Sequence, residues 1–233
     1  MENGRVRLIE IAERDINSGR MMEKFPDTVI YADTLISVPV NYYAEVKVGD
    51  GNTVTVKSCQ KKKLIKLLGG DKVGKKVSVL YVNRKKLTTM SWGIGSLPIK
   101  YDFLGGATIN VGANGNFLAE IVDAGELYTA MQSENETVDI TEVISIITAA
   151  FRSCASKILV EMFNEAIEPI FQTDFLVSEL YRRLNERICN KKLKILPGVV
   201  FKWATVAGIR VREEDKNALL ARYSGKNQSG ARR

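Results

Sequence analysis

The sequence contains no histidine. Histidine is the general base of Ser-His-Asp and Cys-His catalytic sites, the commonest zinc ligand, and the side chain that titrates nearest neutral pH. Its absence excludes all three kinds of chemistry, although carboxylate, lysine and metal–phosphate chemistry stays open in principle. We therefore expect a protein that is not an enzyme, with no catalytic residues, no cofactor and no metal site.

Cysteine is scarce as well. The chain has Cys59, Cys154 and Cys189, an odd number at unpatterned positions. Such usage fits free, inert thiols in a reducing cytoplasm better than a disulfide framework. Three cysteines also cannot build a four-cysteine zinc site within one chain.

Long apolar runs are missing too. No run approaches the ~20 residues that a bilayer-spanning helix needs. The first residues, MENGRVRLIEIAERD, are charged throughout, unlike a secretory signal peptide. The 233 residues fit one large domain or two small ones with room for a buried core. We expect a cytoplasmic protein whose membrane contact is at most peripheral, at the inner face.

The N-terminal half of the sequence is predicted to be rich in β-strands. Val, Ile, Thr and Tyr dominate residues 21–58, and Gly49-Asp50-Gly51 within EVKVGDGNTVTV predicts a hairpin. The segment KKKLIKLLGG (61–70) predicts one or two helical turns ending at a glycine. KVSVLYVN and KLTTMSW are predicted to form a strand pair. ATINVGANGNFLAEIVD (107–123) predicts a second hairpin with Asn114-Gly115 at its turn, and a short helix is expected to begin at Gly125.

Helical periodicity takes over near residue 135. Apolar residues at three- and four-residue spacing define one face of a long helix: Ile140, Val143, Ile144, Ile147, Phe151, Cys154, Ile158 and Met162. Asp139 is expected to begin this helix and Pro169 to end it. A second helix repeats Leu180, Tyr181, Leu184 and Ile188 on one side.

The chain is then predicted to return to a strand over residues 199–211 and to a last helix over 212–223, followed by a disordered basic tail, SGKNQSGARR. The order of elements predicts a single α+β domain.

The glycine pair in TMSWGIGSLPIKYD invites comparison with phosphate-binding loops. A dinucleotide-binding loop needs G-x-G-x-x-G opening onto a helix, but here the third glycine is missing and Pro98 favours extended chain before it. No Gly-Lys-Ser/Thr follows to make a Walker loop. We predict that Gly93-Ile94-Gly95 is a bend between strands, with Trp92 in the core.

Two consecutive stretches carry a family resemblance. VLYVNRKKLTTMSWGIGSLPIKYD followed by ATINVGANGNFLAEIVDAGELY resembles the core of an SPFH domain (stomatin, prohibitin, flotillin and HflKC, also called band-7). The resemblance is closest to the soluble, virion-core-protein-like branch found in bacteria and phages. It implies an SPFH-like α+β domain over residues 25–215, with an N-terminal segment at 1–24. Residues 216–233 would hold the end of the last helix and a flexible basic tail.

The resemblance implies a scaffold. SPFH domains are non-enzymatic modules that assemble side by side into rings or cages, usually on membranes, around partner proteins. We accordingly expect a homo-oligomer that organises protein partners at a membrane surface or in a particle, with a phage-encoded origin as one reading. The membrane members' hydrophobic anchor, heptad-bearing helix and zinc ribbon have no counterpart in this sequence, so anchoring and coiled-coil ring closure are not implied.

Positive charge is concentrated in one segment. From Lys57 to Lys86 there are eleven Lys or Arg and one acid, Asp71, a local charge of +10 in a chain of +7. The residues predicted to bind an anionic surface are Lys61, Lys62, Lys63, Lys66, Lys72, Lys75, Lys76, Arg84, Lys85 and Lys86.

Several interpretations of this charge stay open. It can be a solvated face that keeps the protein soluble, or it can bind an anionic lipid surface, an acidic protein or a nucleic acid. KKKLIKLLGG, with Leu64, Ile65, Leu67 and Leu68, could lie shallowly in a lipid interface. Nucleic acid is less favoured because no known binding motif or interleaved aromatic residues accompany the lysines. A basic nucleic-acid-associated accessory protein is the alternative function.

Three weaker candidates have plain structural interpretations. The acid clusters Glu134/Glu136 and Glu213-Glu214-Asp215 fall at expected helix starts, where the macrodipole favours them. Val199, Phe201 and Trp203 are expected in a sheet core. The pair Tyr42-Tyr43 is either buried in a strand, which we favour, or exposed at a protomer interface.

Overall fold

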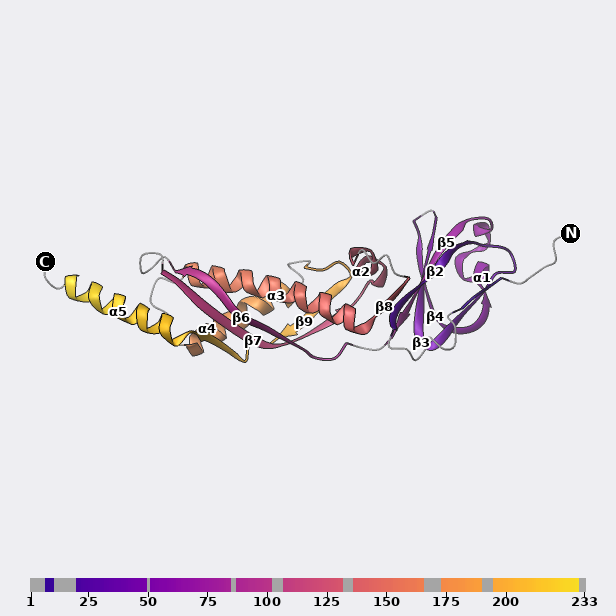
Figure 1. Ribbon diagram of the computed structural model, residues 1–233. Coiled ribbons are helices and arrows are strands. Elements are labelled where there is room, and N and C mark those ends of the chain that lie inside the picture. Colours follow the sequence, from indigo (N-terminus) through magenta and orange to yellow (C-terminus); the bar gives the residue numbers. More distant parts are fainter. Residues whose placement is uncertain are drawn as a thin grey trace. The chain divides into compact units, whose positions relative to one another are not determined.

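The computed structural model describes residues 7–10, 20–49, 51–84, 87–101, 107–131, 136–165, 173–189 and 195–230. The chain is α+β, as predicted, with a β-rich first half followed by helices and a late strand–helix pair (Figure 1). It divides into two compact units. The first unit comprises Met1–Lys86 and Ile121–Ile146, and the second Leu87–Glu120 and Ile147–Arg233. The expected boundaries of one domain over 25–215 stay a prediction.

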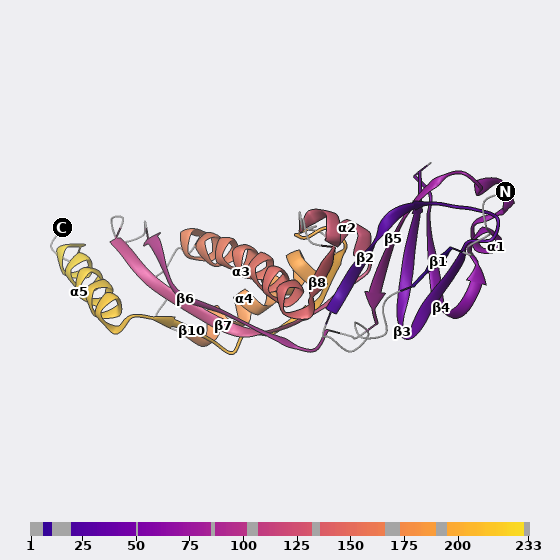
Figure 2. The same cartoon turned by 45° about the vertical axis from the view of Figure 1, so that its right-hand side comes forward.

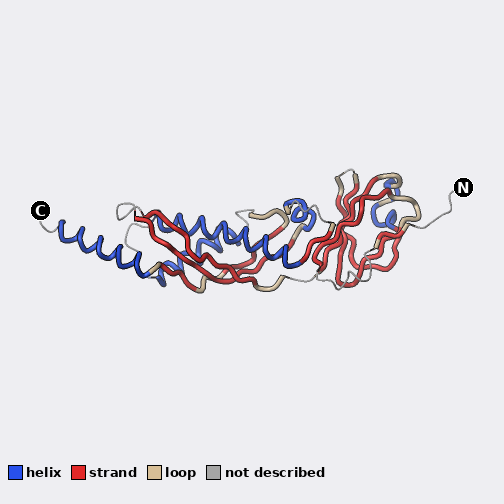
Figure 3. Tube along the Cα trace, in the orientation of Figure 1, coloured by secondary structure: helices blue, strands red, loops and turns tan. Residues whose placement is uncertain are grey.

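The first unit is built on a six-stranded sheet, drawn largely in red in Figure 3. Its strands are β1 (Leu8–Ile9), β2 (Arg20–Val29), β3 (Leu35–Val48), β4 (Thr53–Lys63), β5 (Lys76–Asn83) and β8 (Thr137–Asp139). The order is β1-β3-β5-β2-β8, and β4 pairs with β3. The predicted β3–β4 hairpin is confirmed, with Gly51 supplying the positive φ, 90°, that its turn requires.

Strand β3 bends within this sheet. In the β3–β5 register Tyr81 lies opposite Ala44, yet the Tyr81 hydroxyl lies within hydrogen-bond distance of the carbonyl oxygens of Ser37 (3.1 Å) and Ile9 (2.9 Å). Ser37 and Ala44 would lie more than about 20 Å apart on a straight strand. The β3–β4 register shifts between Ser37 and Tyr43, so β3 turns there and its first part lies over the core.

Two short helices close the first unit. Helix α1 (Leu64–Leu68) ends at Gly69, whose φ of 92° confirms the predicted glycine end, and a 3-10 turn, Gly70–Lys72, follows. Helix α2 (Ala124–Ala130) confirms the short helix expected near Gly125. The Asp123 carboxylate caps α2 by accepting from the amide of Glu126 at 2.8 Å.

The second unit packs helices on a four-stranded sheet. Its strands are β6 (Met90–Tyr101), β7 (Ala107–Ile121), β9 (Val199–Ala204) and β10 (Gly208–Val211), in the order β10-β7-β6 with β9 also beside β7. The helices are α3 (Ile140–Glu165), which belongs to this unit from Ile147 on, α4 (Thr173–Leu184), which continues as a π-helical turn at Asn185–Cys189, and α5 (Glu213–Gly230). Helix α3 runs alongside β6 and β7 (Figures 1 and 2). The long helix expected from residue 140 is therefore confirmed, whereas Pro169 lies outside the described residues.

Aromatic rings join these helices to the sheet. Phe117 of β7 stacks on Phe151 of α3, with centroids 4.3 Å apart, and Trp92 and Phe201 lie 5.6 and 5.5 Å from the same ring. The Trp92 indole also donates to the carbonyl oxygen of Thr205 at 3.2 Å. Trp92 is only 3% exposed, so its predicted place in the core is confirmed.

Helix α3 differs from expectation in one respect. It is long and apolar enough to cross a membrane, with a mean hydropathy of 1.6 over its most apolar window, although no such segment was expected. Length and composition are weak evidence, because a core helix of a soluble protein meets the same test. Ile147, Phe151, Ala155 and Leu159 are fully buried, as in such a core helix.

Two predicted turns are wrong. Asn114-Gly115 lies inside β7, a single strand of 15 residues, and Gly93-Ile94-Gly95 lies inside β6, a single strand of 12 residues. The β6–β7 register shifts between Ile94 and Leu97, so the predicted bend is a bulge within one strand. Gly115 is required by packing, since a Cβ there would lie 2.0 Å from the Thr205 carbonyl oxygen.

Other element boundaries also differ. β5 and β6, predicted to pair, belong to different sheets. The late strand is split into β9 and β10, and between them the amides of Thr205 and Ala207 donate to the carbonyl oxygens of Asn116 and Asn114 on β7. Helix α5 continues to Gly230, well beyond the predicted end at 223, into the segment expected to be disordered.

The remaining aromatic predictions have mixed outcomes. Val199 and Phe201 are buried, at 9% and 3% exposure, but Trp203 is 36% exposed, because the alternation of buried and exposed residues along β9 breaks after Phe201 and Ala204 is buried instead. Tyr42 is buried, at 2% exposure, as favoured. Tyr43 is half-buried, and burial together with the nearby Glu45 carboxylate raises its pKa to about 12.

Candidate functional site

Seven of the predicted lysines gather at one end of the first unit. The Leu64 amide donates to Thr34 O at 2.9 Å, and the Ile30 amide donates to Lys75 O at 3.0 Å. These bonds bring the end of β4 and the start of β5 to the two ends of one short turn, residues 30–34. We call this region the basic end: Lys61, Lys62, Lys63, Lys66, Lys72, Lys75 and Lys76.

Most of these side chains face solvent. Lys61, Lys62, Lys63, Lys66 and Lys76 are exposed, whereas Lys72 and Lys75 are half-buried. Lys72 lies 3.9 Å from the Asp71 carboxylate, and Asp33 lies in the turn between β2 and β3. Positive charge still predominates strongly, so this end attracts anions.

Three residues of this end were missed by sequence reasoning. The carbonyl oxygen of Arg7 accepts from the Leu35 amide at the start of β3, and the Arg7 guanidinium lies 5.8 Å from the centre of the Tyr31 ring. Tyr31 and Val73 are large apolar side chains that remain 49% and 50% exposed. They come from three separate segments, and no spacing in the sequence shows that these segments meet.

The leucines of α1 that could have lain in a lipid interface pack instead toward the core of the first unit. Leu64 is fully buried, and Leu67 and Leu68 pack against the apolar core of the first unit. Ile65 is half-buried. The apolar face of α1 therefore packs against the core, and among the described residues of this end Tyr31 and Val73 are the large apolar side chains that are well exposed.

The other predicted cations lie elsewhere. Arg84 follows the far end of β5, where its amide donates to Asn41 O at 2.7 Å. The length of β5 places it roughly 25 Å from Lys76. Arg84 is therefore not part of the basic end. Lys85 and Lys86 lie outside the described residues.

The Glu45 carboxylate has a structural role in the first unit. Glu45 on β3 accepts hydrogen bonds from the amides of Ala124 (3.2 Å) and Gly125 (2.9 Å) at the start of α2. Burial raises the pKa of Glu45 above its ordinary value, the Asp123 charge adds to that, and the two amide bonds oppose it. These bonds attach α2 to the sheet.

The cysteines and the acidic residues at helix starts also have positions that the fold explains. All three cysteines are free and half-buried, and burial raises the pKa of Cys189 to about 11. Glu213, Glu214 and Asp215 form the first turn of α5, as predicted for a helix start, whereas Glu134 is not described. Within the described ranges, no group of three or more Cys, Asp or Glu could hold a metal ion.

No protein-family model matches the chain, and no curated protein matches it either. The resemblance to SPFH domains stays a prediction that rests on the residues quoted above.

Proposed function

We propose that this protein is a non-enzymatic, SPFH-like scaffold that self-associates and docks on an anionic membrane surface through its basic end. The observation that carries the docking proposal is the convergence of exposed lysines on one end of the first unit, beside exposed Tyr31 and Val73. The self-association rests on the family resemblance. In this role the protein organises partner proteins at the surface or within a particle.

The electrostatic attraction of one basic end to a membrane is weak. It therefore suits a protein that binds in several linked copies better than one that binds as a single copy. Each Lys close to an anionic leaflet contributes about 1 kcal/mol, so the exposed lysines of the basic end together supply about 5 kcal/mol. That gives one copy only weak, salt-sensitive binding. Several linked copies bind much more tightly, because later contacts become intramolecular.

Nucleic acid is the alternative ligand for the same lysines. Sequence-independent binding to single strands normally combines basic residues with aromatic side chains on which bases stack. The exposed aromatic residue described at this end is Tyr31, and the Arg7 guanidinium already lies over its ring. We therefore favour the membrane surface.

The test is co-sedimentation with phosphatidylserine-containing vesicles at low salt. Replacing Lys61, Lys62, Lys63 and Lys66 with Gln should weaken binding at least about tenfold, because these lysines face the leaflet. The charge-matched control replaces Lys47, Lys57, Arg152 and Lys157, which are exposed but lie outside the basic end. It should bind like the unmodified protein.

Two results would contradict this proposal. One is an unmodified protein that does not bind anionic vesicles at low salt. The other is tighter binding to single-stranded DNA than to vesicles at equal ionic strength, which would favour the nucleic-acid alternative.

A further inference from the structure

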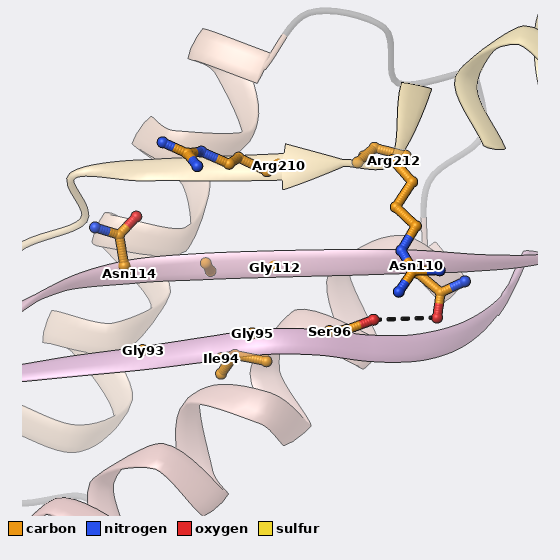
Figure 4. Close-up of a pocket in the computed structure, with 11 residues that line it drawn as sticks. Gly93, Ile94, Gly95, Ser96, Asn110, Gly112, Asn114, Arg210 and Arg212 are labelled. Atoms are coloured by element: carbon orange, nitrogen blue, oxygen red, sulfur yellow. Dashed lines mark hydrogen bonds between the residues drawn. The ribbon is translucent and has the colours of Figure 1, made fainter. Parts of the chain in front are cut away.

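The second unit has a groove on the face of its sheet. The groove crosses β6, β7 and β10 and has a volume of about 710 Å³ (Figure 4). Its floor includes Gly93 and Gly95 of β6 and Gly112 of β7, and Asn110, Asn114, Arg210 and Arg212 contribute polar side chains. The Ile94 side chain points to the opposite side of the sheet, so the floor of the groove is largely bare backbone.

Packing explains one of these glycines but not the other two. A Cβ on Gly112 would lie 2.9 Å from the Gly95 carbonyl oxygen, so the bulge in β6 requires glycine there. A Cβ on Gly95 would meet nothing within 4 Å, and one on Gly93 would meet only the Asn114 Cβ at 4.0 Å. Neither has a positive φ. Glycine inside a strand weakens it and often marks a place where a ligand or another backbone approaches closely.

The charged side chains that line the groove are positive, and the Asp215 carboxylate lies beside its Asn110 end. Arg210 and Arg212 are exposed, and neither has an ion-pair partner among the described residues. None of the described lining residues is acidic. Asn110 is already held, since its backbone and side-chain amides donate to Asp215 and its side-chain oxygen accepts from Ser96 at 3.2 Å.

The two guanidinium groups diverge. Arg210 extends along β10 toward the end of the groove at Asn114, whereas Arg212 reaches toward Asn110 (Figure 4). Because the guanidinium groups are directed apart, one small anion contacts only one of them in this arrangement. A ligand with spaced negative charges can contact both.

We propose that this groove binds an extended acidic peptide segment of a partner protein. The peptide backbone lies over the glycine floor, two of its carboxylates pair with Arg210 and Arg212, and Asn114 offers an amide to its main chain. A nucleic-acid strand fits less well, because the lining contains no aromatic side chain for base stacking. This site is distinct from the basic end and does not depend on membrane docking.

The experiment measures fluorescence polarisation of a labelled peptide of alternating Glu and Ser, with Gln replacing Glu in the neutral control peptide. Because the basic end also attracts acidic peptides, all measurements are made in the protein with Lys61, Lys62, Lys63 and Lys66 replaced by Gln. The acidic peptide should bind at low salt and the neutral one should not. Adding R210Q and R212Q should weaken binding about tenfold, the sum of two exposed ion pairs.

A steric variant separates the groove from general charge. Gly95→Leu places a side chain in open space, so the melting temperature should be retained while peptide binding is lost. The charge-matched control R152Q/K157Q, on α3 and outside the groove, should bind normally.

Several results would overturn the proposal. One is that the acidic peptide does not bind. Another is that R152Q/K157Q loses as much peptide affinity as R210Q/R212Q. A third is that peptide binding is unchanged in both R210Q/R212Q and Gly95→Leu. Full displacement by millimolar inorganic phosphate would indicate a simple anion site. Tighter binding of oligothymidylate than of the acidic peptide would assign the groove to a nucleic acid. If the acidic peptide does not bind and R210Q/R212Q abolishes self-association, the groove would be assigned to a second copy of the chain.

Discussion

At the scale of single residues, the glycines of β6 and β7 have different roles that the sequence does not distinguish. Gly112 and Gly115 lie where a Cβ would meet backbone atoms, at 2.9 and 2.0 Å, whereas Gly93 lies where a Cβ has room. Sequence reasoning assigned Asn114-Gly115 to a turn and Gly93 to a bend, because glycine most often marks a change of direction. In this sheet Gly112 and Gly115 lie at close packing contacts, whereas Gly93 lies on the open floor of the groove.

Alanine substitutions should separate these two roles. Gly115→Ala should lower the free energy of unfolding by about 2 kcal/mol or more, because the new Cβ must push the Thr205 backbone away from Trp92. Gly93→Ala should raise the free energy of unfolding by about 0.5 kcal/mol, because glycine loses more conformational entropy than alanine on forming a strand. Urea unfolding of both variants measures this. A Gly93→Ala variant as unstable as Gly115→Ala would show that Gly93 is also constrained by packing.

The same scale explains which site residues could be predicted. The lysines of the basic end are consecutive or nearly so, and charge density within Lys57–Lys86 is visible without a fold. Arg7, Tyr31 and Val73 could not be assigned to the same surface, because only the pairing of β1 with β3 and the turn between β2 and β3 bring them there. Arg84 was grouped with the lysines for its position in the sequence, and β5 carries it away.

At the scale of elements, helix ends are linked by ion pairs as well as by apolar packing. Glu179 of α4 binds both Arg182 and Arg183, at 2.7 and 2.6 Å, and Arg183 also reaches Glu165 near the end of α3 at 2.7 Å. Hydrogen bonds from these guanidinium groups lower the pKa of Glu179 from 4.5 to about 2. The Glu179 carboxylate therefore helps to fix α4 against α3.

Substitution of Glu179 should give a pH-dependent loss of stability. Because folding lowers this pKa, the ionised carboxylate stabilises the fold above about pH 4.5, and the effect is lost as pH falls toward 2. Glu179→Gln should therefore lower the free energy of unfolding by about 1 kcal/mol at neutral pH. The difference from the unmodified protein should shrink steadily below pH 4.5. A difference that is constant across this range would show that Glu179 acts by packing alone.

Elements with strong local signals were predicted well. The β3–β4 hairpin carries its Gly-Asp-Gly turn between two alternating strands, and α3 repeats its apolar residues at helical spacing over many turns. Strand β7 was divided wrongly because Asn-Gly is a strong hairpin signal, yet alternate burial continues through Ala113, Gly115 and Phe117. Pairing of β7 with β6, β9 and β10 keeps it straight through a sequence that locally favours a turn.

At the scale of the whole molecule, the α+β class and the order of elements followed from the sequence, whereas the division into two units did not. The first unit takes Ile121–Ile146 from the later part of the chain, so its sheet is completed by β8, a strand of three residues. Such long-range pairing depends on tertiary contacts that leave no local pattern. β5 and β6 were paired for their closeness in sequence, and they belong to different sheets.

The proposed function also belongs to this scale. Docking through one basic end is weak for a single copy and becomes strong when several copies act together, so the scaffold account requires self-association. The groove of the second unit would then present partner-binding sites in as many copies as the assembly holds.

The native mass tests the account most directly. Size-exclusion chromatography with light scattering, across a range of concentrations at physiological salt, should give a mass several times the chain mass of 25.9 kDa. A uniform mass at a fixed multiple would indicate a closed assembly, as expected of a ring or cage. A mass of 25.9 kDa at every concentration, with no increase on anionic vesicles, would contradict the scaffold account.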